Sequence, residues 1–168
     1  MRKLNYQDAL ALTTEKLAHG GIFLTVKGET PNTMTIGWAT IGHIWNRPVF
    51  MVLVRPQRHT YEMLKKAGEF TVSVPTKNPL LKELAFAGTK SGRDLNKFDG
   101  HGITAAKGQT IETPVIEECG LHFECKVVLT QDMTGERMDT ALMDRCYPER
   151  DFHTMFFGEI VDCYTTDE

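Results

Sequence analysis

The stretch VFMVLVRPQRHTYEMLKKAG occupies residues 49–68. Its first six residues form an apolar run that indicates a strand, and residues 61–68 indicate a short helix with a lysine-rich, solvated face. The segment between them, residues 55–61, therefore joins the end of a strand to the start of a helix. Such a junction directs free backbone N–H groups outward, while Thr60 adds a hydroxyl and Arg58 a charge. These groups suit a phosphate, although a helix cap with a surface arginine is the alternative interpretation.

A second basic stretch, GTKSGRD, occupies residues 88–94. The chain as a whole carries a formal net charge of −3, so these cations are a local concentration in a protein that is not basic. A small phosphorylated ligand is therefore favoured over a nucleic acid. The stretch is not a nucleotide P-loop, because it follows a predicted helix and lacks the Gly-x-x-x-x-Gly-Lys-Ser/Thr order.

The composition is that of an ordinary globular protein. With 168 residues, 41% hydrophobic and 24% charged, the chain fits one domain that spans residues 1–168. No apolar run approaches the roughly 20 residues of a membrane-spanning helix, and residues 1–8 lack the apolar segment of a secretory signal. We therefore expect a cytoplasmic protein that does not interact with membranes, and its four cysteines are expected to be thiols.

Short strand-like runs dominate the rest of the chain. Two runs, residues 69–75 and 121–129, alternate apolar with polar side chains, which predicts strands with one solvated face. Helices are expected after Asn5, at 61–68, and from Asn78 and Pro79 to Gly88. About six or seven strands with helices only as plugs predict a mainly β protein, a small β-barrel. The strands that complete this count are expected at 22–27, at 32–41, at 49–54 after a loop closed by residues 46–48, and at 154–164.

One spacing has the residue types of a metal site. Cys119, His122 and Cys125 follow one another at intervals of three. On a strand, however, His122 points to the face opposite the two cysteines, so that one tetrahedral site does not collect all three. We therefore predict no metal.

Five segments, in this order, resemble the flavin reductase-like, FMN-binding split-barrel family. They are residues 32–35 with Trp38, 55–60, 70–74, 91–94 with 97–98, and His153 with 157–160. The Arg-Pro-x-Arg-x-Thr variant at 55–60 looks most like the flavoredoxin and ferric-reductase branch. The resemblance implies a six-stranded Greek-key barrel, a homodimer, and one FMN per subunit near the interface.

The resemblance also implies where the cofactor binds. Arg58, Thr60 and the helix start would hold the phosphate, with Ser91, Gly92 and Lys97 closing from the other side. His153 is the expected catalytic side chain at the reaction face, although it could instead satisfy a backbone carbonyl, and Trp38 could instead be a core or interface residue. The other expected cofactor-binding residues are Asn32, Thr33, Met34 and Thr35 at the ring edge, and Val54, Arg55, Pro56, Ser73, Val74, Ala87 and Gly88 around it.

The implied activity is hydride transfer from NADH or NADPH to FMN, with onward transfer of electrons to free flavin, ferric complexes or a redox partner protein. No Gly-x-Gly-x-x-Gly motif opens a βαβ unit, so the nicotinamide is expected to bind against the flavin in an open groove. Two alternatives remain: a flavoredoxin-type electron carrier without turnover, and a domain whose flavin pocket has decayed. Better-studied two-component reductases carry a small hydroxyl residue where this chain has Arg58, which favours a retained FMN here.

Overall fold

The computed structural model describes residues 1–167, so Glu168, which ends the predicted domain span, lies outside the described residues. The chain is mainly β, as expected from the sequence. Its strands are β1 (Arg2–Lys3), β2 (Ile22–Val26), β3 (Asn32–Ile36), β4 (Ala39–Ile44), β5 (Arg47–Val54), β6 (Glu69–Val74), β7 (Ala105–Ala106), β8 (Val115–Ile116), β9 (Leu121–Asp132) and β10 (Thr154–Thr165). Its helices are the 3₁₀ turn η1 (Tyr6–Ala9), α1 (Leu10–Ala18), α2 (His59–Ala67), α3 (Leu81–Thr89) and α4 (Thr140–Cys146).

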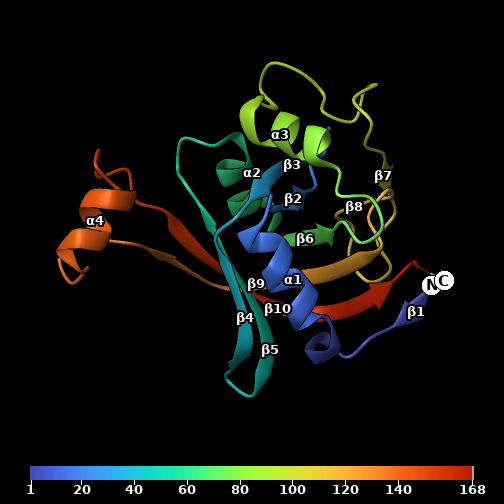
Figure 1. The fold of residues 1–168 in the computed structure, drawn as a ribbon, viewed down its shortest axis with the longest axis horizontal. Coiled ribbons are helices and arrows are strands. Elements are labelled where there is room, and N and C mark those ends of the chain that lie inside the picture. The colour runs from blue at the N-terminus through green and yellow to red at the C-terminus, as the bar shows by residue number, and fades with distance from the viewer. Residues whose placement is uncertain (168) are drawn as a thin grey trace.

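Eight strands form one antiparallel sheet in which hydrogen-bonded neighbours follow the order β3-β2-β6-β9-β10-β5-β4, with β1 on β10. Strands β7 and β8 form a separate pair. Helices α2 and α3 lie at the β3 side of the sheet, and α4 stands away from the body at the far ends of β9 and β10 (Figure 1). Within residues 1–167 the path of paired strands ends at β3 and β4, so closure into a barrel stays a prediction.

The largest core cluster is formed by buried side chains from β2, β3, β5, β6, β9 and β10, together with residues of α1 and α2. Phe50, Phe70, Phe123 and Phe156 are fully buried in one cluster, and the rings of Phe50 and Phe123 meet edge to face at 5.2 Å. Burial of each such ring contributes about 1.5–3 kcal/mol. The three longest helices have nine residues each, and no helix within residues 1–167 has the length and apolar character to cross a bilayer. The four cysteines are free.

The predicted single strand at residues 32–41 is wrong in detail. The structure breaks it at Gly37 and Trp38 into β3 and β4, and the predicted loop before β5 is a two-residue hairpin turn. Trp45 and Asn46 occupy that turn with φ of 55° and 57°. Such turns require two consecutive left-handed residues, which Asn tolerates and Trp rarely adopts. The break between β3 and β4 is important for the site, because it exposes Trp38.

The predicted solvated faces of β6 and β9 are also wrong where the two strands pair. Thr71, Ser73, His122 and Glu124 are all buried, because residues 108–116 fold over them. The Glu124 carboxylate accepts the backbone N–H groups of residues 109, 110 and 111 at 2.6–2.9 Å, and the Thr71 hydroxyl donates to the carbonyl of residue 114 at 2.6 Å. The polar side chains of the alternating pattern therefore form hydrogen bonds with backbone groups of the covering segment instead of with water.

Two of the three predicted helices need comment. The helix predicted from Asn78 and Pro79 begins at Leu81, because Leu80 adopts a left-handed φ of 47° and turns the chain just before it. The helix predicted at 61–68 is α2, which begins two residues earlier, at His59. This earlier start brings its first turn directly to the Arg58 segment.

Candidate functional site

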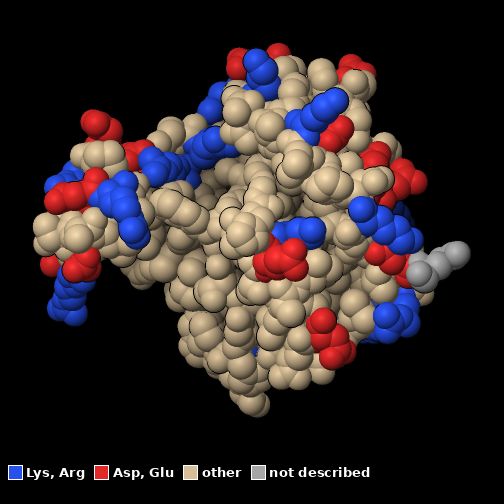
Figure 2. Space-filling view, in the orientation of Figure 1, with Lys and Arg blue, Asp and Glu red and all other residues tan. Residues whose placement is uncertain are grey.

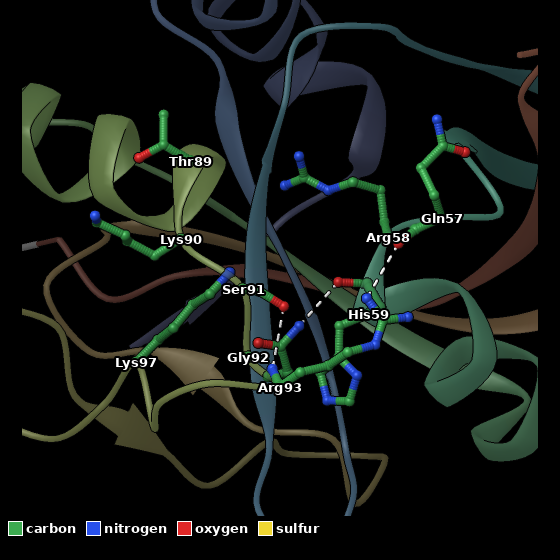
Figure 3. A pocket seen from close by; sticks show the side chains of 11 residues that line it. Gln57, Arg58, His59, Thr89, Lys90, Ser91, Gly92, Arg93 and Lys97 are labelled. Atoms are coloured by element: carbon green, nitrogen blue, oxygen red, sulfur yellow. Dashed lines mark hydrogen bonds between the residues drawn. The ribbon is translucent and has the colours of Figure 1, made fainter.

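A cavity of about 140 Å³ opens between the start of α2 and the segment that follows α3. Figure 3 shows Arg58 and His59 coming from the first of these and Ser91, Gly92, Arg93 and Lys97 from the second. The two basic stretches of the sequence therefore meet, as the phosphate hypothesis requires. The full lining is Asn32, Gln57, Arg58, His59, Thr60, Thr89, Lys90, Ser91, Gly92, Arg93 and Lys97.

The electrostatics of this cavity favour an anion. No aspartate or glutamate occurs among the described residues that line it. The Lys97 side chain is only 2% exposed and donates to the carbonyls of Thr33 and Ala87 at 2.7 and 2.8 Å. Burial, reinforced by the charge of Arg58, lowers the pKa of Lys97 to about 8. An uncompensated ammonium of this kind would be stabilised by a bound anion.

Three further features shape the wall of this cavity. The Oδ1 atom of Asn32 is buried without a hydrogen-bond partner, while its Nδ2 donates to the Thr60 hydroxyl at 2.9 Å. A Cβ on Gly92 would overlap the Asn32 amide and approach the His59 ring to 2.9 Å, so a larger residue there would displace these side chains. Helix α2 also begins at the cavity, and the first N–H groups of a helix have no acceptor within the helix.

A second cavity of about 270 Å³ adjoins the first and shares Arg58 with it. It lies where β3 gives way to β4 and is more apolar. Trp38, 46% exposed, forms part of its wall. The lining is Met34, Thr35, Ile36, Gly37, Trp38, Leu53, Arg55, Arg58 and His153. Figure 2 shows Lys and Arg side chains in a row along the upper rim of the hollowed central face, from the α4 protrusion toward the top of the molecule.

Arg55 and His153 are held by the segment that follows α4. Arg55 forms an ion pair with Asp151, donates to the carbonyl of Cys146 at 3.2 Å, and lies 5.5 Å from the centre of the Tyr147 ring. The Nδ1 atom of His153 lies 2.8 Å from the Tyr147 hydroxyl. Burial, together with the charge of Arg55, lowers the pKa of His153 to about 4, so its imidazole is neutral near pH 7.

The predicted site residues divide into two groups. The structure brings eleven of them to the two cavities: Asn32, Met34, Thr35, Trp38, Arg55, Arg58, Thr60, Ser91, Gly92, Lys97 and His153. Seven do not line either cavity: Thr33, Val54, Pro56, Ser73, Val74, Ala87 and Gly88.

Three of these seven support the site indirectly. The carbonyls of Thr33 and Ala87 bind Lys97, and the carbonyl of Gly88 accepts from Arg58 at 2.9 Å. Ser73 instead lies beneath the covering loop, where its hydroxyl contacts His122 Nδ1 at 3.1 Å and accepts the N–H of residue 116. Cofactor contacts of all eighteen predicted residues, eleven at the cavities and seven outside them, stay predictions.

Several lining residues were not assigned a role from the sequence. Gln57, Lys90 and Arg93 lie within the quoted basic stretches, so their positions could have been inferred from their neighbours. Tyr147 and Asp151 do not line either cavity but hold His153 and Arg55, and no sequence signal indicated this, because residues 133–153 contain no periodic pattern that indicates what they contact.

Residues 14–168 match the model of the flavin reductase like domain. An uncharacterized protein of Archaeoglobus fulgidus is 34% identical over 140 residues, which cover 83% of this chain and 68% of that protein. Among solved structures, the flavoredoxin of Desulfovibrio vulgaris (Miyazaki F) is 24% identical with a TM-score of 0.67, and the match covers 88% of this chain and 69% of that one.

Two other solved structures share this fold. An FMN-binding protein from Thermus thermophilus with bound p-hydroxybenzaldehyde is 22% identical with a TM-score of 0.68, covering 87% of this chain and 71% of that one. An NADH:FAD oxidoreductase of Streptomyces globisporus is 21% identical with a TM-score of 0.66, and the match covers 87% of this chain and 75% of that one. At these identities, the likeness to the three structures concerns the fold alone.

Proposed function

This chain belongs to the flavin reductase-like domain family, and on that premise we propose that it binds FMN and uses it in an NAD(P)H-dependent oxidoreductase reaction. The observation that carries the proposal is the pair of joined cavities, one cationic and one more apolar, with Arg58 in the wall of both. FMN has the same division, because a phosphate lies at one end and a tricyclic ring at the other.

The phosphate end fits the first cavity. Arg58 and Lys97 supply charge, Ser91 supplies a hydroxyl, and the start of α2 supplies backbone donors. Because Gly92 has no side chain, the Asn32 amide and the His59 ring pack directly against it in the wall of this cavity.

The ring end fits the second cavity, where Met34 and Leu53 offer apolar contact and Trp38 offers an aromatic wall. Strand β3 ends the path of paired strands, so its outer edge presents backbone donors and acceptors to a polar ring edge. Arg55 and His153 add polar groups at the far side of the cavity. The structure thus offers each part of FMN a chemically matched surface.

When bound, FMN supplies the hydride-accepting and electron-transferring chemistry, and the protein supplies binding, orientation and a local field. Arg58, which forms no ion pair within residues 1–167, places positive charge beside the cavity that would take the ring, whereas the charge of Arg55 is compensated by Asp151; this favours an anionic reduced ligand over a neutral one. His153 is neutral near pH 7 and therefore contributes a hydrogen bond there instead of a third positive charge. We also propose that the chain acts as one cytoplasmic domain and that it forms a homodimer.

Two measurements test this function. The absorption spectrum of the purified protein, or of the protein after addition of FMN and gel filtration, is expected to contain the bands of oxidised flavin. The FMN-loaded protein is then expected to oxidise NADH or NADPH with a flavin or ferric acceptor. Retention of FMN without nicotinamide oxidation would support the electron-carrier alternative, and failure to bind any flavin would contradict the proposal altogether.

The affinity for FMN is expected to peak between about pH 6 and pH 8. Below about pH 6 the phosphate loses its second negative charge. Above pH 8 the empty site contains neutral Lys97, so FMN binding must be accompanied by proton uptake and weakens by up to about tenfold per pH unit. Fluorescence titrations across this range measure the effect. Riboflavin, which has no phosphate, provides the control, and its affinity should fall neither below pH 6 nor above pH 8 for these reasons. An FMN affinity independent of pH from 7 to 10 would contradict the role of Lys97.

A further inference from the structure

Tyr147 is a buried tyrosine that contacts the predicted catalytic histidine. It directly follows α4, is 3% exposed, and its hydroxyl lies 2.8 Å from Nδ1 of His153. The two rings meet edge to face at 5.5 Å, while Trp38 lies 5.3 Å from the His153 ring on the side of the second cavity. The rings of Trp38 and Tyr147 also lie 6.1 Å apart, so the imidazole packs with two aromatic rings in one three-ring cluster, and its Nδ1 is already hydrogen-bonded.

The chemistry of the neighbours fixes the direction of this hydrogen bond. The Tyr147 hydroxyl has two possible acceptors, the imidazole nitrogen at 2.8 Å and the Met133 sulfur at 3.6 Å. A thioether is a weak acceptor, whereas an unprotonated imidazole nitrogen is a strong one. Donation from the hydroxyl to Nδ1 therefore gives the stronger hydrogen bond, and in that arrangement a neutral His153 carries its proton on Nε2. Within residues 1–167 no side chain or carbonyl forms a hydrogen bond with that Nε2.

We propose that Tyr147 is a positioning residue that fixes His153 in its Nε2–H tautomer, so that the imidazole presents one neutral N–H donor to the second cavity. The functional meaning of this donor rests on the proposed function, because the second cavity is the place assigned to the flavin ring. An N–H donor suits the carbonyl oxygens and ring nitrogens on the polar edge of a flavin.

The charges around His153 are consistent with a neutral ring. Arg55 approaches from β5, and Asp151 approaches from the segment after α4 but is already paired with Arg55. Asp132, at the end of β9, accepts from the Thr154 hydroxyl at 2.7 Å. Neither carboxylate is bonded to the imidazole, whereas Arg55 and burial both disfavour the imidazolium. Tyr147 thus determines which of the two neutral tautomers His153 adopts, and burial with the charge of Arg55 disfavours the imidazolium near pH 7.

The test is ¹⁵N–¹H NMR of the histidine rings in flavin-free protein at pH 7, where nitrogen shifts distinguish the tautomers. We expect His153 to be Nε2–H in the unmodified protein. In Tyr147→Phe, the ratio of Nε2–H to Nδ1–H should fall by about tenfold, as expected for loss of one hydrogen bond. Tyr61→Phe is the matched control, since Tyr61 packs on Phe156 away from both cavities. An Nδ1–H tautomer in the unmodified protein, or an unchanged ratio in Tyr147→Phe, would overturn the proposal.

A double-mutant cycle then tests whether the donor acts on the flavin. The side chain of glutamine offers an N–H donor that does not depend on Tyr147, so Tyr147→Phe should shift the spectrum and affinity of bound FMN in the His153 protein but not in His153→Gln. Equal effects in both backgrounds would mean that Tyr147 acts only structurally. The two proposals can fail separately. If the protein does not bind FMN, the proposed function is rejected, but the tautomer of His153, which is measured in flavin-free protein, is still tested.

Discussion

Replacement of Arg58 by alanine is expected to weaken FMN binding about 10- to 150-fold, which corresponds to the roughly 1.5–3 kcal/mol lost with a charge-assisted hydrogen bond. Arg58 is partly buried, lines both cavities and remains charged, even though burial lowers its pKa. Its loss should therefore affect the phosphate directly and also remove charge beside the ring. Titration of FMN fluorescence against protein measures the change.

Two companion variants make the Arg58 result specific. Arg47→Ala removes another arginine, which is paired on the surface with Glu159 at 2.7 Å, and should leave the affinity unchanged. Arg58→Lys keeps a charge but loses the planar fork, so an intermediate affinity is expected. Because Arg58 also donates to the Gly88 carbonyl, urea unfolding should accompany the titrations. Unchanged FMN affinity in a folded Arg58→Ala protein would refute the assignment of this residue.

Gly92→Ala is expected to reduce FMN affinity by at least about tenfold, because overpacking of a tight site costs on the order of 1–3 kcal/mol. The new Cβ would overlap the Asn32 amide, which is itself held by the Thr60 hydroxyl and is 4% exposed. The side chain at position 32 would have to move into the cavity or lose that bond. Isothermal titration calorimetry with FMN reports the loss.

Gly42→Ala is the matched control for this substitution, since nothing lies within 4 Å of a Cβ at position 42. It should bind FMN like the unmodified protein. If Gly92→Ala also retained full affinity, the close approach at residue 92 would not be needed for the ligand, and the phosphate would have to lie elsewhere in the cavity.

The elements that the sequence predicted well are those determined by local patterns. The apolar run before Arg55 is β5, and the lysine-rich segment that ends at Gly68 is α2, with Gly68 as a left-handed cap at φ of 64°. The faces of β6 and β9 were misjudged because residues 108–116, which cover both, have no pattern that indicates this contact and lie 43 residues from their partners in β6. A polar residue on an alternating strand satisfies a buried backbone group as readily as it satisfies water, and alternation alone does not distinguish the two.

The two cavities of the candidate site also differ in how far local sequence patterns predicted them. The anion cavity is built mainly from two contiguous basic stretches, which residue types alone marked as cationic, while the family resemblance was needed to group Arg58 with Ser91 and Lys97. The ring cavity depends on long-range contacts. Its residue Arg55 is held by Asp151, and His153 is bound by Tyr147, both from a segment that carries no helical or strand periodicity.

The projecting α4 segment supports only one of the two cavities directly. Groups that would grip the phosphate come from α2 and from the chain after α3, which rest on the main body. Groups that orient Arg55 and His153 come instead from an outlying arm carried on β9 and β10. A crosslink that shifts this arm is therefore expected to disturb Arg55 and His153 first, and to reach the first cavity only through Gln57, whose Nε2 donates to Asp151 at 3.2 Å.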